Sequence, residues 1–451
     1  MERLADFNFT TYLTSRRDSG VIVWLCNLGA EKYWHAQGAG VIDKYEEGVV
    51  NRIEEMNLLL CRSQDIMILH RAPAQEYLDY LKGIGFSIPR ILTPSDGAPL
   101  IPISEKVLGD ERLQQQLRQL VQEHGNVYFI PYAVTGLEEE IALRCGLNLV
   151  GAPSHISALV NDKIFSRKIS EQLGLAVCAG RVCNTVEEVR ATYCQLTQAS
   201  PSFKRVVIKE PYGASGKGLH LVEDDSRLQA LLARLSRLSK SKPDAAWLVE
   251  GWYDKARDIN YQIFITEKGQ VEVFSIKQQI LKGTVYLGSK IPAPIEESVR
   301  KAYQQFGMMV GHSLYDLGYR GLASIDSIVT QDGTIIPVIE INGRFTLSTY
   351  VSFLNQLPRD CCVQTKYFRL TTRRPVAYGD LLSALENKEI LYGPGSRRGV
   401  IIYTAGTLPE RPIENDTLHL GRLFALVVAE DWQEAEGIQG KLEEVVVALS
   451  A

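Results

Sequence analysis

Short apolar runs alternate with longer amphipathic stretches over residues 21–155. Val21–Leu25 and residues 127–130 are continuous apolar segments, which is typical of strands buried on both faces. Residues 75–82 predict a short helix, and residues 105–123 predict one polar helix whose leucines recur at roughly helical spacing. This alternation of strands and helices predicts a parallel sheet with helices on its faces.

The pattern changes beyond residue 155. Two short strands, at 206–209 and 219–222, lie on either side of a glycine-rich segment, and an antiparallel hairpin is expected after a helix that ends at Leu317. The chain has 451 residues, which is too long for a single core. We therefore expect α/β and α+β structure in three domains, with limits at 1–155, 156–360 and 361–451.

Composition and charge exclude several classes of partner. Charged residues make up 23% of the chain, and the net charge of -4 is not gathered into any block of one sign, so no nucleic-acid partner is expected. The eight cysteines form neither a CxxC pair nor a zinc spacing, which favours reduced thiols in the cytoplasm. The N-terminus lacks a signal peptide and the apolar runs are too short to span a membrane, so we expect a cytoplasmic protein with no membrane partner.

A candidate phosphate site follows the strand at residues 206–209. Lys209 ends that strand, and the segment Gly213–Gly218, with the sequence GASGKG, comes directly afterwards. Glycines let backbone N–H groups approach a polyphosphate, and a lysine supplies a mobile positive charge. The spacing fits neither a Walker loop nor a Rossmann fingerprint, because a strand and not a helix follows. The pattern therefore favours a hairpin flap over phosphates, with a plain flexible turn as the alternative.

A candidate magnesium site lies on the hairpin near residue 332. Glu340 and Asn342 are two apart, so on a strand they share a face. Asp326 shares that face only if the connecting loop has an odd number of residues or a bulge lies near Pro337. We predict such a register, because two carboxylates and an amide oxygen are hard ligands suited to magnesium. The alternative is a solvated acidic hairpin.

The ordered set NDK (Asn161–Lys163), VIKEP with GASGKG, LVEGWY with DIN, and SID with EINGR resembles the ATP-grasp ligase superfamily over about residues 155–355. The resemblance implies an ATP-grasp fold of two α+β subdomains, an N-terminal Rossmann-like pre-ATP-grasp domain and a C-terminal extension. It also implies ATP and magnesium, with two ions, as cofactors. By position it implies phosphate contacts from Lys163 and Lys209, a flap of Gly213, Ala214, Ser215, Gly216, Lys217 and Gly218, an adenine hinge at Glu250, Trp252 and Tyr253, a ribose contact from Asp258, and magnesium ligands Asp326, Glu340 and Asn342.

The resemblance further implies an ADP-forming ligase in which Lys209, Lys217 and Arg344 carry the catalytic charges. Many family members place an arginine two residues before the aspartate, where this chain has Ser324, so Arg344, Arg320 or Lys277 is expected to take its place. The N-terminal pattern and the EINGRFTLSTY string look closest to pheganomycin-type peptide ligases, which join an amino-acid-like acid to an amine or peptide. Butirosin-type ligases, which load an amino acid onto a carrier-protein thiol, are the related alternative.

From this we expect a carboxylate–amine ligase of specialised metabolism that acts through an acylphosphate. Its partners would be a small acid, an amine or peptide, and in the alternative an acyl carrier protein; the family suggests a homodimer. A nucleotide-binding regulatory protein without turnover and a small-molecule kinase are the rivals from other classes.

Overall fold

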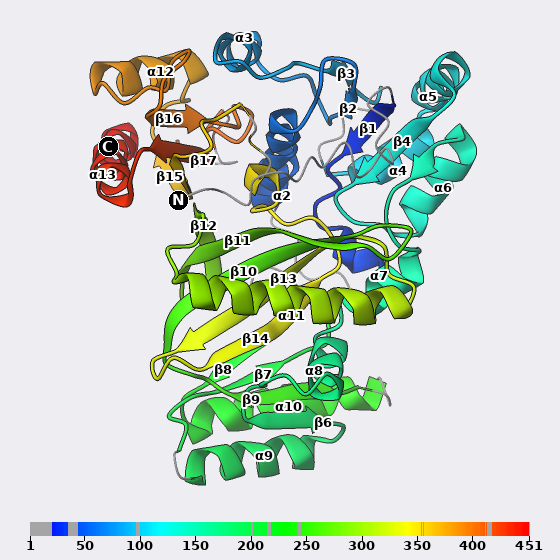
Figure 1. Ribbon diagram of the computed structural model, residues 1–451, viewed down its shortest axis with the longest axis vertical. Helices are drawn as coiled ribbons and strands as arrows, with labels where there is room; N and C mark the ends of the chain where they lie inside the picture. Colours follow the sequence, from blue (N-terminus) through cyan, green and yellow to red (C-terminus); the bar gives the residue numbers. More distant parts are fainter. Residues whose placement is uncertain are drawn as a thin grey trace.

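The computed structural model describes residues 20–34, 44–95, 100–199, 202–213, 218–241, 245–352, 354, 356–410, 412 and 417–450. Over these residues the chain forms a five-stranded, a four-stranded and an eight-stranded sheet, each accompanied by helices (Figure 1). The predicted combination of α/β and α+β structure is confirmed. None of the described helices is both long and apolar enough to cross a lipid bilayer.

The N-terminal sheet is parallel throughout, with the strand order β3-β2-β1-β4-β5, as the alternation of the sequence predicts. Its strands are short and its central ones are buried, so their side chains are apolar on both faces. The elements of this region are β1 (Val21–Leu25), η1 (Ala30–Tyr33), α2 (Lys44–Asn51), η2 (Arg52–Leu59), β2 (Ile66–Ile68), α3 (Gln75–Gly83), β3 (Arg90–Leu92), α4 (Ile103–Gly109), α5 (Glu111–His124), β4 (Val127–Pro131), α6 (Gly136–Cys145) and β5 (Asn148–Leu149).

The prediction of one continuous helix over residues 105–123 was wrong. The chain forms α4 and α5 there, with a break at Asp110. Asp110 has an extended backbone, and its carboxylate accepts a hydrogen bond from the N–H of Leu113 at 3.0 Å. An aspartate in this position satisfies a free N–H group at a helix start, so a local N-cap outweighs the helical spacing of the leucines.

The four-stranded sheet forms the lower part of the molecule in Figure 1 and is antiparallel, with the order β6-β9-β7-β8. The helix α8 connects it to the rest of the core, because the Ser166 hydroxyl accepts a hydrogen bond from the N–H of Ile341 on β14 at 3.0 Å. The elements here are α7 (Ser154–Val160), α8 (Lys163–Gln172), β6 (Gly180–Cys183), α9 (Val186–Gln198), β7 (Val206–Lys209), β8 (Leu219–Val222), α10 (Asp225–Ser241) and β9 (Trp247–Gly251).

The eight-stranded sheet has the order β14-β13-β10-β11-β12-β15-β17-β16. Its strands β10, β11 and β13 are apolar on the face that α11 crosses, with Tyr261, Ile263 and Ile325 buried there, and polar on the other face. The elements are β10 (Lys255–Ile265), β11 (Val271–Lys282), β12 (Val285–Ile291), α11 (Glu297–Asp316), β13 (Gly321–Thr330), β14 (Ile335–Asn342), η3 (Tyr350–Ser352), β15 (Cys362–Thr372), α12 (Tyr378–Asn387), β16 (Gly399–Ile402), β17 (His419–Ala429) and α13 (Trp432–Ser450).

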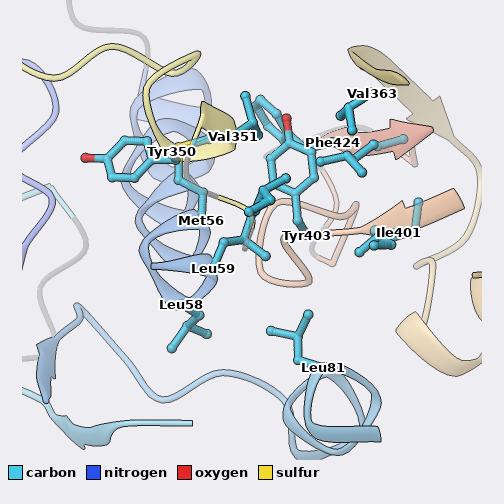
Figure 2. Packing of buried hydrophobic residues seen from close by; sticks show 14 of the residues in the cluster. Met56, Leu58, Leu59, Leu81, Tyr350, Val351, Val363, Ile401, Tyr403 and Phe424 are labelled. Atoms are coloured by element: carbon cyan, nitrogen blue, oxygen red, sulfur yellow. The ribbon is translucent and has the colours of Figure 1, made fainter. Parts of the chain in front are cut away.

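The C-terminal part shares its core with the N-terminal part. Figure 2 shows Met56 and Leu59 of η2 beside Tyr350 and Val351. Tyr403, which directly follows β16, and side chains of the C-terminal strands pack against them. The same eight-stranded sheet continues across residue 360, since β12 pairs with β15. The domain limits at 155 and 360 therefore stay predictions, while sheet and core are continuous across the second limit.

Candidate active site

The hairpin of β13 and β14 places Asp326 directly opposite Glu340, and Ser324 opposite Asn342. Thr330 donates its N–H to the carbonyl of Thr334 at 3.0 Å, so the loop consists of residues 331–333, an odd number. The pairing is also irregular just beyond Asp326, opposite the stretch that contains Pro337. The predicted register is confirmed, and the three side chains lie on one face of the sheet.

Three side-chain amides donate hydrogen bonds to the Asp326 carboxylate. Its Oδ1 accepts from Asn260 Nδ2 and from Gln279 Nε2, each at 2.9 Å, and its Oδ2 accepts from Asn342 Nδ2 at 3.3 Å. Burial, followed by the charge of Glu340, raises the pKa of Asp326 to about 6. The two carboxylates therefore repel one another in the absence of a cation.

Lys163 connects the two ends of the candidate site. It stands in the first turn of α8, which Asp162 caps by accepting from the N–H of Ile164 at 2.6 Å. The Lys163 ammonium is 2.8 Å from the carbonyl oxygen of Gly213 and 3.0 Å from Glu340 Oε1, and the residue is only 2% exposed. The start of the glycine segment and the acidic hairpin thus meet at one lysine.

Lys209 is buried beside a second acidic group. Its Nζ lies 2.5 Å from Glu250 Oε2, while Arg167 lies 3.0 Å from Glu250 Oε1. Burial alone would lower the pKa of Lys209. The charge of Glu250, the hydrogen bond that Glu250 accepts and the charge of Glu340 act together against burial, and the pKa is raised. The Glu250 side chain, predicted as part of an adenine hinge, is therefore engaged by two cations in this structure.

The other predicted nucleotide contacts lie next to this pair. The cations of Arg205 and Lys255 each lie within 6 Å of the centre of the Trp252 ring. Asp258 is paired with the same Lys255, and burial raises its pKa. These residues are partly exposed and follow β9 or begin β10. The Tyr253 ring packs edge-on against Phe203, so it makes a packing contact in addition to its predicted role at the adenine hinge.

The predicted flap lies partly outside the described residues, which exclude Ala214, Ser215, Gly216 and Lys217. Its two ends are described. Lys209 pairs with Leu219 in antiparallel strands, and Gly218 adopts a φ of 76° that favours glycine. The chain therefore leaves β7 and returns along β8, which is the hairpin geometry that the sequence predicts.

Arg344 lies beyond the end of the acidic hairpin, because β14 ends at Asn342. Its guanidinium is buried against the N-terminal part: Nε lies 3.1 Å from Glu31 Oε1, and Nη1 donates to the Tyr132 hydroxyl at 3.0 Å. Burial alone would lower the pKa of Arg344, but Tyr132 and then Glu31 outweigh it and raise the pKa. Arg344 thus joins the acidic hairpin to the N-terminal sheet.

Sequence reasoning missed the polar face that surrounds these residues. Asn260 and Gln262 alternate on β10, and Lys277 and Gln279 alternate on β11, with Asn260 directly opposite Lys277 on one side and Asp326 on the other. The period-two polar pattern within these strands was the available signal. Arg167, the second partner of Glu250, had no such signal, since α8 carries it to Glu250 only through tertiary packing.

The donor set fits a magnesium ion. No group of three or more histidine, cysteine, aspartate or glutamate side chains gathers among the described residues, so the candidate set is two carboxylates and the Asn342 amide. Oxygen ligands of this kind suit a hard divalent cation that phosphates share. A cation between Asp326 and Glu340 would also offset the repulsion that raises the Asp326 pKa.

Three family models match this chain in order. A pre-ATP-grasp domain matches residues 53–147, an ATP-grasp domain matches residues 160–348, and a PGM1 C-terminal domain matches residues 380–442. The second match spans Lys163, Lys209 and the acidic hairpin.

Relatives and solved structures agree with these matches. The chain is 29% identical over 334 residues to the [butirosin acyl-carrier protein]–L-glutamate ligase of Niallia circulans, covering 73% of each chain. The biotin carboxylase domain of 2-oxoglutarate carboxylase from Hydrogenobacter thermophilus, solved with MgADP, superposes with a TM-score of 0.56 at 15% identity, covering 95% of this chain and 90% of that one. An N5-carboxyaminoimidazole synthase from Aspergillus clavatus, solved with ADP, gives 0.54 at 14% identity over 95% and 99% of the two chains.

The chain carries an ATP-grasp domain, with a pre-ATP-grasp domain before it and a further C-terminal domain after it. These domains and the similarity to that ligase mark the protein as an ATP-dependent ligase.

Proposed function

We propose that this protein uses ATP to activate a small carboxylic acid, an amino acid or a similar acid, and joins it to the amine of a second substrate. The observation that carries the proposal is the Lys163 contact with both Gly213 and Glu340, at 2.8 and 3.0 Å. This contact unites a flap suited to phosphates with a carboxylate pair suited to magnesium. The proposed nucleotide contacts and metal ligands are those that the family resemblance implies.

In the first step a carboxylate oxygen of the acid attacks the γ-phosphorus of ATP, the bond to the β-phosphate oxygen breaks, and ADP leaves. In the second step the amine attacks the acyl carbon, phosphate leaves, and the amine nitrogen loses a proton to solvent. Magnesium, when bound, neutralises charge on the phosphate oxygens.

The chain contributes alignment and fixed charge to both steps. Lys163 and Lys209 are held by Glu340 and Glu250, so their ammonium groups are positioned before the nucleotide arrives. An acylphosphate hydrolyses readily, so the site has to exclude water while this intermediate is present.

A second candidate is transfer of the activated acid to the thiol of a carrier protein. The relative from Niallia circulans, whose name gives an acyl-carrier protein and L-glutamate, favours this acceptor. The first step is then the same, and a thioester forms in place of an amide.

The test is a screen of amino acids and small acids with ATP, magnesium and hydroxylamine, which traps an acylphosphate as a coloured hydroxamate. We expect acid-dependent hydroxamate and ADP from the wild type and neither from Glu340→Gln. Phosphate that stays on the acid product would indicate a kinase, and nucleotide binding without ADP would indicate a regulatory protein; either result would contradict the proposal.

Hydroxamate-positive acids are then offered to an amine library and to a phosphopantetheinylated carrier protein, with intact-mass detection of the products. An acylated carrier without amide product would select the thiol acceptor.

A further inference from the structure

The acid substrate needs a positive group beside the acidic hairpin, and this chain offers three candidates. Arg344 is committed to Glu31 and Tyr132. Arg320 donates to the carbonyl oxygens of Tyr315 and Tyr319, and its guanidinium carbon lies 3.5 Å from the centre of the Tyr315 ring. The hydrogen bonds and ion pairs of both arginines therefore go to groups outside the polar face of the eight-stranded sheet, although the charge of Arg344 also acts on Glu340 and Asp326.

Lys277 lies on that face. It is opposite Asn260 on β10, and Asn260 is in turn opposite Asp326 on β13. Two strand spacings, about 10 Å, therefore separate the backbone of Lys277 from that of Asp326. The lysine is fully buried, at 0% exposure.

The hydrogen-bond partners of Lys277 carry no charge. Its Nζ donates to the carbonyl oxygen of Ser348 at 2.6 Å and to the Ser348 hydroxyl at 3.3 Å, and both partners are neutral. An ammonium has three N–H bonds, so one remains for another acceptor. No carboxylate among the described residues forms an ion pair with it. Burial lowers its pKa well below the ordinary value, and the charge of Asp326 offsets only part of that effect. A buried charge without an ionic partner is costly.

A second open position lies in the same network. The Gln262 amide nitrogen is 3.2 Å from the Ser348 hydroxyl, while its Oε1 is buried without a hydrogen-bond partner. Among the described residues, one N–H of the Lys277 ammonium and the Gln262 Oε1 thus remain available on the two sides of Ser348. Buried polar groups are nearly always satisfied, so their coincidence points to a ligand that carries both an anionic and a hydrogen-donating group.

We propose that Lys277 binds the carboxylate of the acid substrate, in the role that an arginine at Ser324 would otherwise take. The inference rests on the proposed ligase function and names the residue that recognises the acid. A carboxylate between Lys277 and the Asp326–Glu340 hairpin would neutralise the ammonium and present its oxygen to the transferring phosphoryl group. An α-amino acid would also supply a donor for Gln262 Oε1.

A structural role for Lys277 is the competing explanation, in which it only ties down the Ser348 turn. The two roles predict different effects of a substitution. Loss of a purely structural contact would change folding and nucleotide binding. Loss of a carboxylate contact would change the KM for the acid and the acid-dependent rate.

The test compares Lys277→Met, Lys277→Arg and the matched control Arg320→Met. Hydroxamate formation is measured with each amino acid that the wild type uses, and MgADP affinity is measured by calorimetry. For Lys277→Met we expect MgADP affinity within about twofold of the wild type and a fall in kcat/KM for the acid of roughly 100-fold, typical of losing one member of a buried charge pair. Lys277→Arg should recover part of that loss, and Arg320→Met should match the wild type.

Equal kcat/KM for the acid in wild type and Lys277→Met would overturn the role of Lys277 while leaving the ligase function intact. If Lys277→Met does not fold, Lys277→Arg with wild-type MgADP affinity and an unchanged KM for the acid would overturn it too. Absence of hydroxamate from the wild type with every acid would overturn the ligase proposal, and the substrate role of Lys277 with it.

Discussion

Replacing Asp326 with asparagine should stabilise the metal-free protein while it abolishes turnover. The structure places this carboxylate opposite Glu340, and its pKa is about 6, where an aspartate ordinarily has 3.8. One unit of pKa corresponds to 1.36 kcal/mol, so ionising Asp326 costs about 3 kcal/mol more in the folded protein than in the unfolded chain.

The sign of the pH dependence follows from the raised pKa. The folded protein holds this proton more tightly than the unfolded chain, so the stabilising contribution is present below pH 3.8 and is lost as the pH rises through 6. Between pH 5 and pH 8 the wild type should lose about 1.4 kcal/mol of unfolding free energy that Asp326→Asn does not lose. Titrating groups that do not interact with Asp326 are common to both proteins and cancel in the comparison.

The assay is urea unfolding of both proteins at pH 5 and pH 8 in EDTA, followed by tryptophan fluorescence. The hydrogen bonds from Asn260 and Gln279 to Oδ1 are available to an asparagine oxygen as well, which makes asparagine a conservative replacement. Identical pH dependence in the two proteins would refute the picture of a strained carboxylate pair. Added MgADP should then stabilise the wild type more than the variant, because only the wild type keeps both carboxylates.

Three further outcomes are expected. Glu340→Gln should reduce ADP formation by about 100-fold or more, since it removes a fixed charge at the site of phosphoryl transfer, and near-normal ADP release would contradict the site. Glu250→Gln should cost about 3–5 kcal/mol of unfolding free energy, because Lys209 and Arg167 would lose their shared buried counter-charge; an unchanged urea midpoint would argue against that network. Cys194 is the exposed one of the eight cysteines, so a thiol reagent should modify one cysteine rapidly in the native protein and the rest only after unfolding, with peptide mapping to identify it.

Much of the fold could be read from local patterns. The parallel N-terminal sheet, the hairpin with its odd loop and the antiparallel strands around the glycine segment all follow from apolar periodicity and turn parity, which are properties of neighbouring residues. The same reasoning failed at Asp110, where one capping carboxylate divides a helix that the leucine spacing predicts as continuous.

For the candidate site, too, some features follow from local patterns and others depend on tertiary packing. Local patterns in the sequence nominated the candidate phosphate and metal residues. They also predicted that Asp326, Glu340 and Asn342 share a face, because alternation along a strand fixes side-chain direction. Tertiary packing was needed to show that Lys163 meets Glu340, that Glu250 is shared by two cations, and that Lys277 has no ion-pair partner among the described residues. Those contacts depend on which distant strands and helices pack together. Burial sets the electrostatic energy of each charged group, and burial cannot be deduced from the local spacing of residues.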